Sequence, residues 1–82
     1  MPKRLSRAER WQVAAMHAHD ALTNLYEIQQ EYQEWYDNLP ESLQNSSTGQ
    51  KLEAVCNIEI SGALESAQEA VDADLPLGPR YD

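Results

Sequence analysis

The sequence predicts an all-α protein, built as an antiparallel helical hairpin with arms of unequal length. Two long runs of residues carry apolar side chains at helical spacing, and a turn-forming segment lies between them. Only the segment Ile58-Glu59-Ile60 alternates as a strand would, and no second strand candidate exists to pair with it. We therefore expect the 82 residues to form one helical domain, 1–82.

The first arm is predicted over residues 7–38. Ser6 and Glu9 have the spacing of a capping box, in which each side chain accepts a hydrogen bond from the other residue's backbone N–H. Apolar residues then follow at alternating spacings of three and four, which is a heptad seam expected to pack against the second arm. The seam consists of Trp11, Ala14, Ala18, Ala21, Leu25, Ile28, Tyr32, Trp35 and Leu39, and Ala15, Leu22 and Tyr36 widen it on one side. Pro40 ends the helix, because a residue that precedes proline is pushed out of the helical region.

Residues 39–47 are predicted to form the loop between the arms, with a short helical turn at Pro40–Gln44. The second arm is predicted over residues 48–73, where apolar residues recur with a period of 3.6. Ser47–Gln50 is a weaker capping box at its start. Glycine lowers helix propensity by about 1 kcal/mol, so we expect a kink or a close helix approach near Gly62.

An irregular tail is predicted over residues 74–82, because two prolines and a glycine forbid a continued helix. Leu75 and Leu77 favour its folding back onto the helices. A single seam gives a thin core, and chains of this size usually depend on disulfides, metals or oligomerisation. Cys56 is the only cysteine, which excludes a disulfide within the chain. We therefore expect the hairpin to be completed as a homodimeric bundle.

The net charge of −8 is unevenly distributed along the chain. Residues 1–10 hold four basic residues and one carboxylate, a balance of +3, and the remainder holds two basic residues and thirteen carboxylates, a balance of −11. We expect the basic end of the first arm to project past the second arm. The acidic surface repels DNA and attracts proteins with a basic surface. A plainer interpretation is that it serves solubility.

Membrane and secretion signals are absent from the sequence. No apolar run approaches the roughly 20 residues that a membrane helix needs. The basic residues at the N-terminus have no apolar stretch behind them, as a signal peptide would. A single thiol suits a reducing compartment. We expect a cytoplasmic protein.

No group of residues in the sequence predicts catalysis, a cofactor or a metal site. His17 and His19 point about 200° apart on a helix, so both cannot reach one ion. Cys56 has no basic neighbour except Lys51 and is expected to be buried and unreactive. The carboxylates lack the Glu-x-x-His pairs of di-iron bundles. We expect no enzymatic activity.

The most informative surface ends the first arm, where aromatic residues and carboxylates alternate. Trp and Tyr are enriched at binding hot spots. The predicted partner-binding residues are Glu27, Glu31, Tyr32, Glu34, Trp35 and Tyr36. The alternative is that Tyr32 and Trp35 fill the hairpin core and only Tyr36 is partly exposed.

The segment Asp37-Asn38-Leu39-Pro40-Glu41-Ser42-Leu43-Gln44, followed by Gly49-x-Lys51-Leu52, resembles small acidic helical proteins encoded by phages and prophages. Those proteins share an acidic helix that ends in Asn-Leu-Pro-Glu-Ser-Leu-Gln, a Ser/Gly turn and a second acidic helix. The resemblance covers residues 27–73, and the chain departs from it in its aromatic first helix and its tail. It implies a phage setting and no particular activity.

The leading functional hypothesis is a non-catalytic, phage-type interaction protein that binds a host or phage protein through acidic and aromatic helix surfaces, for instance as a counter-defence inhibitor. One alternative is an oligomer that sequesters an anionic nucleotide. Its anion-binding residues would be Lys3, Arg4, Arg7 and Arg10. Another alternative is a structural or assembly factor for phage particles.

Overall fold

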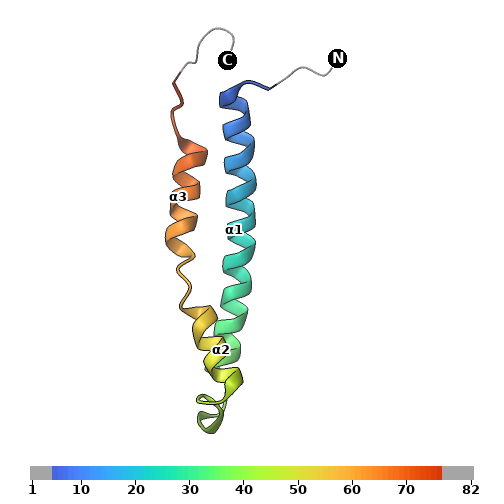
Figure 1. Cartoon of the computed structure of the whole chain (residues 1–82), viewed down its shortest axis with the longest axis vertical. Helices are drawn as coiled ribbons and strands as arrows, with labels where there is room; N and C mark the ends of the chain where they lie inside the picture. Colours follow the sequence, from blue (N-terminus) through green and yellow to red (C-terminus); the bar gives the residue numbers. More distant parts are fainter. Residues whose placement is uncertain (1–4, 77–82) are drawn as a thin grey trace.

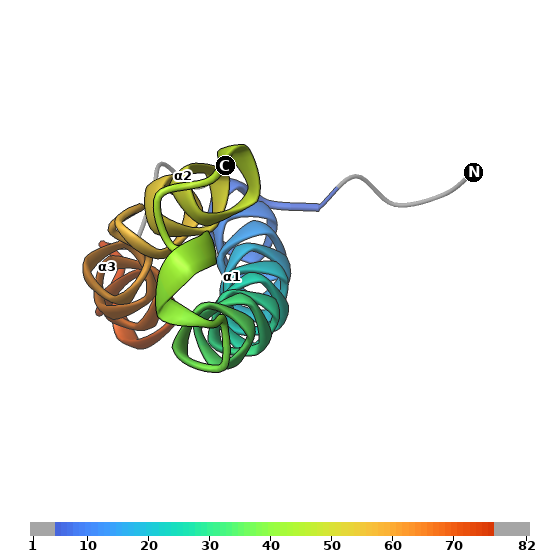
Figure 2. The same ribbon diagram turned by 90° about the horizontal axis from the view of Figure 1, so that it is seen from below.

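The computed structural model describes residues 5–76 and contains only helices and connecting segments over that range. The elements are α1 (Arg7–Asp37), the 3-10 turn η1 (Glu41–Leu43), α2 (Ser47–Cys56) and α3 (Ser61–Asp72). Helices α2 and α3 follow one another back along α1 and both contact it (Figures 1 and 2). The molecule measures 15 Å along its shortest axis. Because a helix with its side chains is about 10–12 Å across, the fold is a single layer of helices.

Helix α1 begins and ends as its local sequence predicts. The Ser6 hydroxyl oxygen accepts from the Glu9 backbone N–H at 3.1 Å, and the Glu9 carboxylate accepts from the Ser6 N–H at 3.2 Å. The predicted capping box is thus confirmed. The last helical residue is Asp37, and Asn38 caps the helix just before Leu39-Pro40.

The turn after α1 closes against the first turn of α2. Ser46 caps α2, and its hydroxyl accepts from the backbone N–H of Gly49 at 3.2 Å. The predicted capping box at Ser47–Gln50 is therefore wrong by one residue. A side chain at position 49 would collide with the carbonyl groups of Gln44 and Leu43. Glycine at this position lets the loop lie directly on the helix.

The return arm is broken, where the sequence predicted one helix with a kink or a close helix approach near Gly62; the nearest atoms to a side chain at position 62 would be those of Glu59. Helix α2 ends at Cys56 and α3 begins at Ser61, so that Gly62 lies inside the first turn of α3. The Gln29 side-chain amide donates to the carbonyl oxygens of Val55 (2.9 Å) and Ile58 (2.8 Å). The Val55 carbonyl also accepts from the Ile58 backbone N–H at 3.2 Å, whereas for the Ile58 carbonyl, beyond the end of α2, the Gln29 amide supplies the donor.

The start of α3 is satisfied by a side chain of the connecting segment. The Glu59 carboxylate accepts from the Gly62 backbone N–H at 2.8 Å and from the Ser61 hydroxyl at 2.7 Å. These two hydrogen bonds lower the pKa of Glu59, chiefly through Ser61 and then through Gly62. Hydrogen bonds donated by Gln29 and accepted by Glu59 thus stabilise both sides of the interruption, which replaces the predicted kink.

The side of α1 that faces the return arm differs from the predicted seam. It is a column of residues seven apart, all buried or half-buried, which we call the packed column: Ala8, Ala15, Leu22, Gln29 and Tyr36. The seam residues of α1 are all exposed, and we call them the apolar stripe: Trp11, Ala14, Ala18, Ala21, Leu25, Ile28, Tyr32 and Trp35. The expectation that the seam fills the space between the arms is wrong. Small residues in the packed column leave room for α3, and Gln29 donates hydrogen bonds to the segment that separates α2 from α3.

The buried core of the described residues is small. Its apolar members are Ala15, Leu52, Ile60 and Ala67, and no side chain there is less than 2% exposed. Near the N-terminal end of α1, the Trp11 indole N–H donates to the carbonyl oxygen of Ala70 in α3 at 2.8 Å. The last turn of α3 therefore lies beside Trp11, and the basic end of α1 extends only about one turn past it, counting 3.6 residues per turn. Within residues 5–76, none of the helices combines the length and the apolar character that crossing a membrane requires.

The tail prediction is tested only in part. Leu75 is half-buried and Leu77 lies outside the described residues, so the expectation that the tail folds back stays a prediction.

Candidate interaction surface

The apolar stripe is the largest unusual feature of the described surface. Its five large side chains, Trp11, Leu25, Ile28, Tyr32 and Trp35, are between 38% and 51% exposed. Soluble monomers rarely leave so many large apolar groups together on one side of a helix. The side chains at this heptad spacing form a continuous strip along α1. This strip is a candidate interaction surface.

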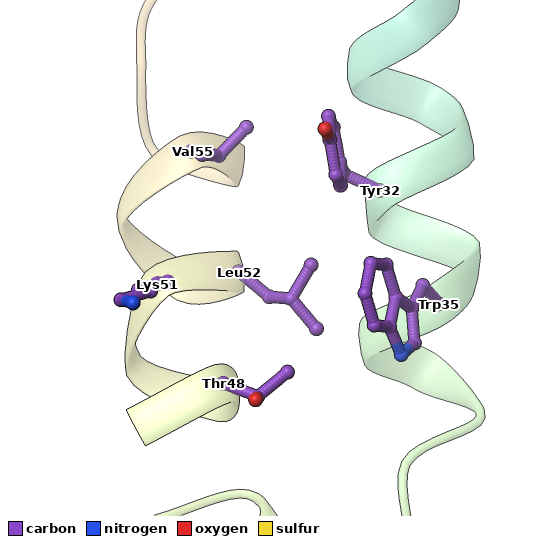
Figure 3. Close-up of a pocket in the computed structure, with 6 residues that line it drawn as sticks. All are labelled: Tyr32, Trp35, Thr48, Lys51, Leu52 and Val55. Atoms are coloured by element: carbon purple, nitrogen blue, oxygen red, sulfur yellow. The ribbon is translucent and has the colours of Figure 1, made fainter. Parts of the chain in front are cut away.

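Near the end of α1, the strip borders a cleft that α1 forms with α2. Tyr32 and Trp35 are stacked there, with ring centroids 6.2 Å apart and ring planes 20° from parallel. They face Leu52, Val55 and Thr48 across a cleft of about 320 Å³ (Figure 3). Lys51 also lines this cleft, although its side chain points away from the two rings (Figure 3).

Two further depressions continue the surface toward the N-terminal end of α1. The first shares Tyr32 and Val55 with the cleft and is lined by apolar groups together with Gln29: Leu25, Ile28, Ile58 and Ile60. The second lies between Trp11 and Ala70, over Ala14 and Ala15. Both arms thus contribute apolar side chains along one side of the layer.

The predicted partner-binding residues divide between two sides of α1. Tyr32 and Trp35 belong to the apolar stripe, whereas Tyr36 is half-buried in the packed column. The alternative placed Tyr32 and Trp35 in the core, which is wrong because both are exposed, whereas Tyr36 is partly exposed as that alternative expected.

The three carboxylates of the predicted set are all exposed. Glu31 borders the apolar stripe, because it lies three residues after Ile28 and four before Trp35. Glu27 and Glu34 are seven residues apart and share the side of α1 that points away from the return arm. The predicted surface therefore has an apolar side and an acidic side.

The predicted anion-binding residues are only partly described. Arg7 and Arg10 are exposed in the first turn of α1. Lys3 and Arg4 lie outside the described residues.

The polar and titratable groups elsewhere form no cluster with obvious chemistry. His17 is exposed, and His19 and Cys56 are half-buried, so the thiol is more accessible than predicted. Among residues 5–76, no three side chains of His, Cys, Asp or Glu come together in a way that could hold a metal ion.

Two residues that shape this surface were missed by the sequence analysis. Gln29 sits in a column that is otherwise apolar or aromatic, and this polar exception was the available signal. Glu59 lies two residues before Ser61, within the alternating segment that also hinted at the interruption.

The chain was compared with protein-family models, with curated proteins and with solved structures. None of these comparisons found a match.

Proposed function

We propose that this chain is a non-catalytic interaction protein that binds another protein through the acidic and aromatic surfaces of α1. The helical hairpin would be completed as a homodimeric bundle. The observation that carries the proposal is the apolar stripe, all of whose members are exposed. Burying apolar area is worth roughly 25 cal/mol per Å², so this stripe favours association.

The composition of the surface supports a protein as the partner. Aromatic side chains such as Tyr32 and Trp35 bury large areas at low cost in conformational entropy, and they are enriched at interaction hot spots. Their cleft, about 320 Å³ in volume and open to solvent, can accept a side chain of a partner.

The acidic side of α1 supports a partner with a basic surface. Glu27, Glu31 and Glu34 are exposed, and no basic residue lies between Trp11 and Gln50. Such a field accelerates the encounter with a basic protein and repels nucleic acid. We propose the cytoplasm of a phage-infected cell as the setting and inhibition of a host defence protein as the role. The resemblance at residues 37–44 supports this setting.

The proposal is tested by charge reversal on the acidic side. We expect the immobilised protein to capture a basic protein from bacterial lysate, and Glu27→Lys/Glu34→Lys to weaken this capture by at least about tenfold. The matched control is Glu65→Lys/Glu69→Lys, which makes the same change of charge on exposed positions of α3.

Capture by the wild type and by the α3 control, with loss in the α1 variant and at high salt, is the expected outcome. Equal weakening of capture in both variants would show that the net charge, and not the acidic side of α1, recruits the protein. Undiminished capture by the α1 variant would refute a role for its acidic side. No capture by the wild type would refute the proposal.

A further inference from the structure

We infer that the apolar stripe of α1 is covered by the apolar stripe of a second copy that lies antiparallel to it. This inference rests on the proposed function and narrows it, because it identifies the partner of the aromatic surface, with Tyr32 and Trp35, as a second copy of this chain. The acidic side, with Glu27 and Glu34, then remains open to a different protein.

The sizes of the stripe residues favour the antiparallel orientation. Alanines occupy the N-terminal half of the stripe (Ala14, Ala18, Ala21), and larger groups occupy the C-terminal half. A parallel pair would set alanine against alanine at one end and aromatic against aromatic at the other. Voids and overpacking both destabilise an interface.

An antiparallel register matches each small residue to a large one. In antiparallel packing, residues of one heptad position face residues of the other. With Ala21 opposite Leu25 of the second copy, Ala18 meets Ile28 and Ala14 meets Tyr32. The same register brings Trp11 to Trp35. Every layer of the pair then holds either one small and one large residue or, at each end, two tryptophans.

The small buried core favours a second copy as the cover of the stripe. Among residues 5–76, the buried apolar residues are Ala15, Leu52, Ile60 and Ala67, and small chains without disulfides or metals usually depend on oligomerisation. The five large side chains of the stripe are 38–51% exposed, so pairing two stripes adds the apolar burial that one chain lacks.

The charges along α1 point the same way. Its first turn carries Arg7 and Arg10 against the single carboxylate of Glu9, and its last two turns carry Glu31, Glu34 and Asp37 without a basic residue. An antiparallel pair places the basic end of each copy beside the acidic end of the other, twice. A parallel pair places like charges together, which disfavours it.

The orientation is tested by disulfide formation between engineered cysteines. In a Cys56→Ser background, we expect a mixture of Ala18→Cys and Ile28→Cys chains to form the mixed disulfide in preference to either symmetric one. A parallel pair would give the two symmetric disulfides, and that result would overturn the inference.

The surface is tested by sedimentation of the full chain. We expect a dimer whose dissociation constant rises more than about tenfold in Ile28→Asp, because the pair would bury an unpaired charge. Met16→Asp is the control, since Met16 is 55% exposed and lies on the opposite side of α1. Circular dichroism checks that both variants remain helical.

A chain that stays monomeric at high concentration would refute the inference, and the stripe would then be open to a helix of another protein. Equal weakening by both variants would place the interface elsewhere and refute it too. These outcomes are independent of the capture experiment, because Glu27 and Glu34 lie outside the proposed interface. A dimer that captures nothing would leave this inference standing without the proposed function.

Discussion

The two sides of α1 differ in what they contact and in what they are made of. The packed column, which faces α2 and α3, contains two alanines, a leucine, a tyrosine and the buried Gln29. The apolar stripe lies beside the return arm and is largely open to solvent, and it contains two tryptophans, a tyrosine, a leucine, an isoleucine and three alanines. The side with the larger apolar groups is therefore the one left open.

This difference shows that hydrophobicity alone does not decide which side of a helix packs within its own chain. Small residues at positions 8 and 15 allow the return arm to approach α1 closely. Gln29 supplies two hydrogen bonds that the interruption between α2 and α3 needs. An apolar group at position 29 would leave the Ile58 carbonyl without this donor, which costs about 1–3 kcal/mol.

The largest expected effect tests this difference between the two sides of α1 by shortening one leucine that is buried between the arms and one that belongs to the apolar stripe. Leu52 faces α1 and is 3% exposed, whereas Leu25 in the apolar stripe is 48% exposed. We expect Leu52→Ala to lower the free energy of unfolding by about 2–4 kcal/mol. We expect Leu25→Ala to lower it by less than about 1 kcal/mol in dilute, dissociated protein.

Urea denaturation followed by circular dichroism measures both changes. Equal losses in dilute protein would mean that Leu25 is covered within the single chain, and the distinction between the two sides would fail.

The second prediction concerns the polar member of the packed column. We expect Gln29→Leu to destabilise the chain by about 1–3 kcal/mol, because the Ile58 carbonyl loses its donor and the Val55 carbonyl keeps only backbone donors. Gln30→Leu, at the neighbouring exposed position, should change stability by less than about 0.5 kcal/mol. A stabilising Gln29→Leu would show that apolar contact outweighs the two hydrogen bonds.

The smallest effect is expected at Glu59, on the other side of the interruption. Its pKa is lowered in the folded chain by hydrogen bonds from Ser61 and Gly62. A lowered pKa means that the contribution to stability is present above the ordinary value of about 4.3 and is lost as the pH falls through the folded-state pKa. Glu59→Gln should therefore melt below the wild type at neutral pH.

The two melting temperatures should converge as the pH falls through the folded-state pKa of Glu59, because the protonated side chain no longer differs in charge from glutamine. Thermal denaturation over a series of acidic pH values measures this, and the other carboxylates cancel because both proteins share them. A difference that stays constant with pH would mean that the Glu59 carboxylate does not cap α3 in solution.

Local signals predicted the parts of the fold that depend on neighbouring residues. The Ser6–Glu9 capping box and the stop at Pro40 each involve residues within one turn, and the structure contains both. The interruption at residues 57–60 depends on Gln29, which lies 26 residues before Val55. No local pattern could reveal that contact, although the alternating segment at Ile58 marked the place.

The choice of packing side was also beyond the sequence. Ala15, Leu22 and Tyr36 were visible as an edge of the apolar seam, because adjacent heptad columns are only about 50° apart. Which column faces the return arm depends on how closely α2 and α3 can approach, and hence on side-chain volumes along the whole interface. Tyr32 and Trp35 were identified as candidate binding residues, and their role in binding stays a prediction.

The division of the return arm has a consequence for how the chain folds. Helices α2 and α3 have 10 and 12 residues, and isolated helices shorter than about 12–15 residues are marginal in water. Neither is expected to persist by itself, so α1 acts as the template on which both form. The helices of the second half of the protein therefore depend on α1 for their stability, and a destabilising substitution confined to α1 should unfold all three helices together.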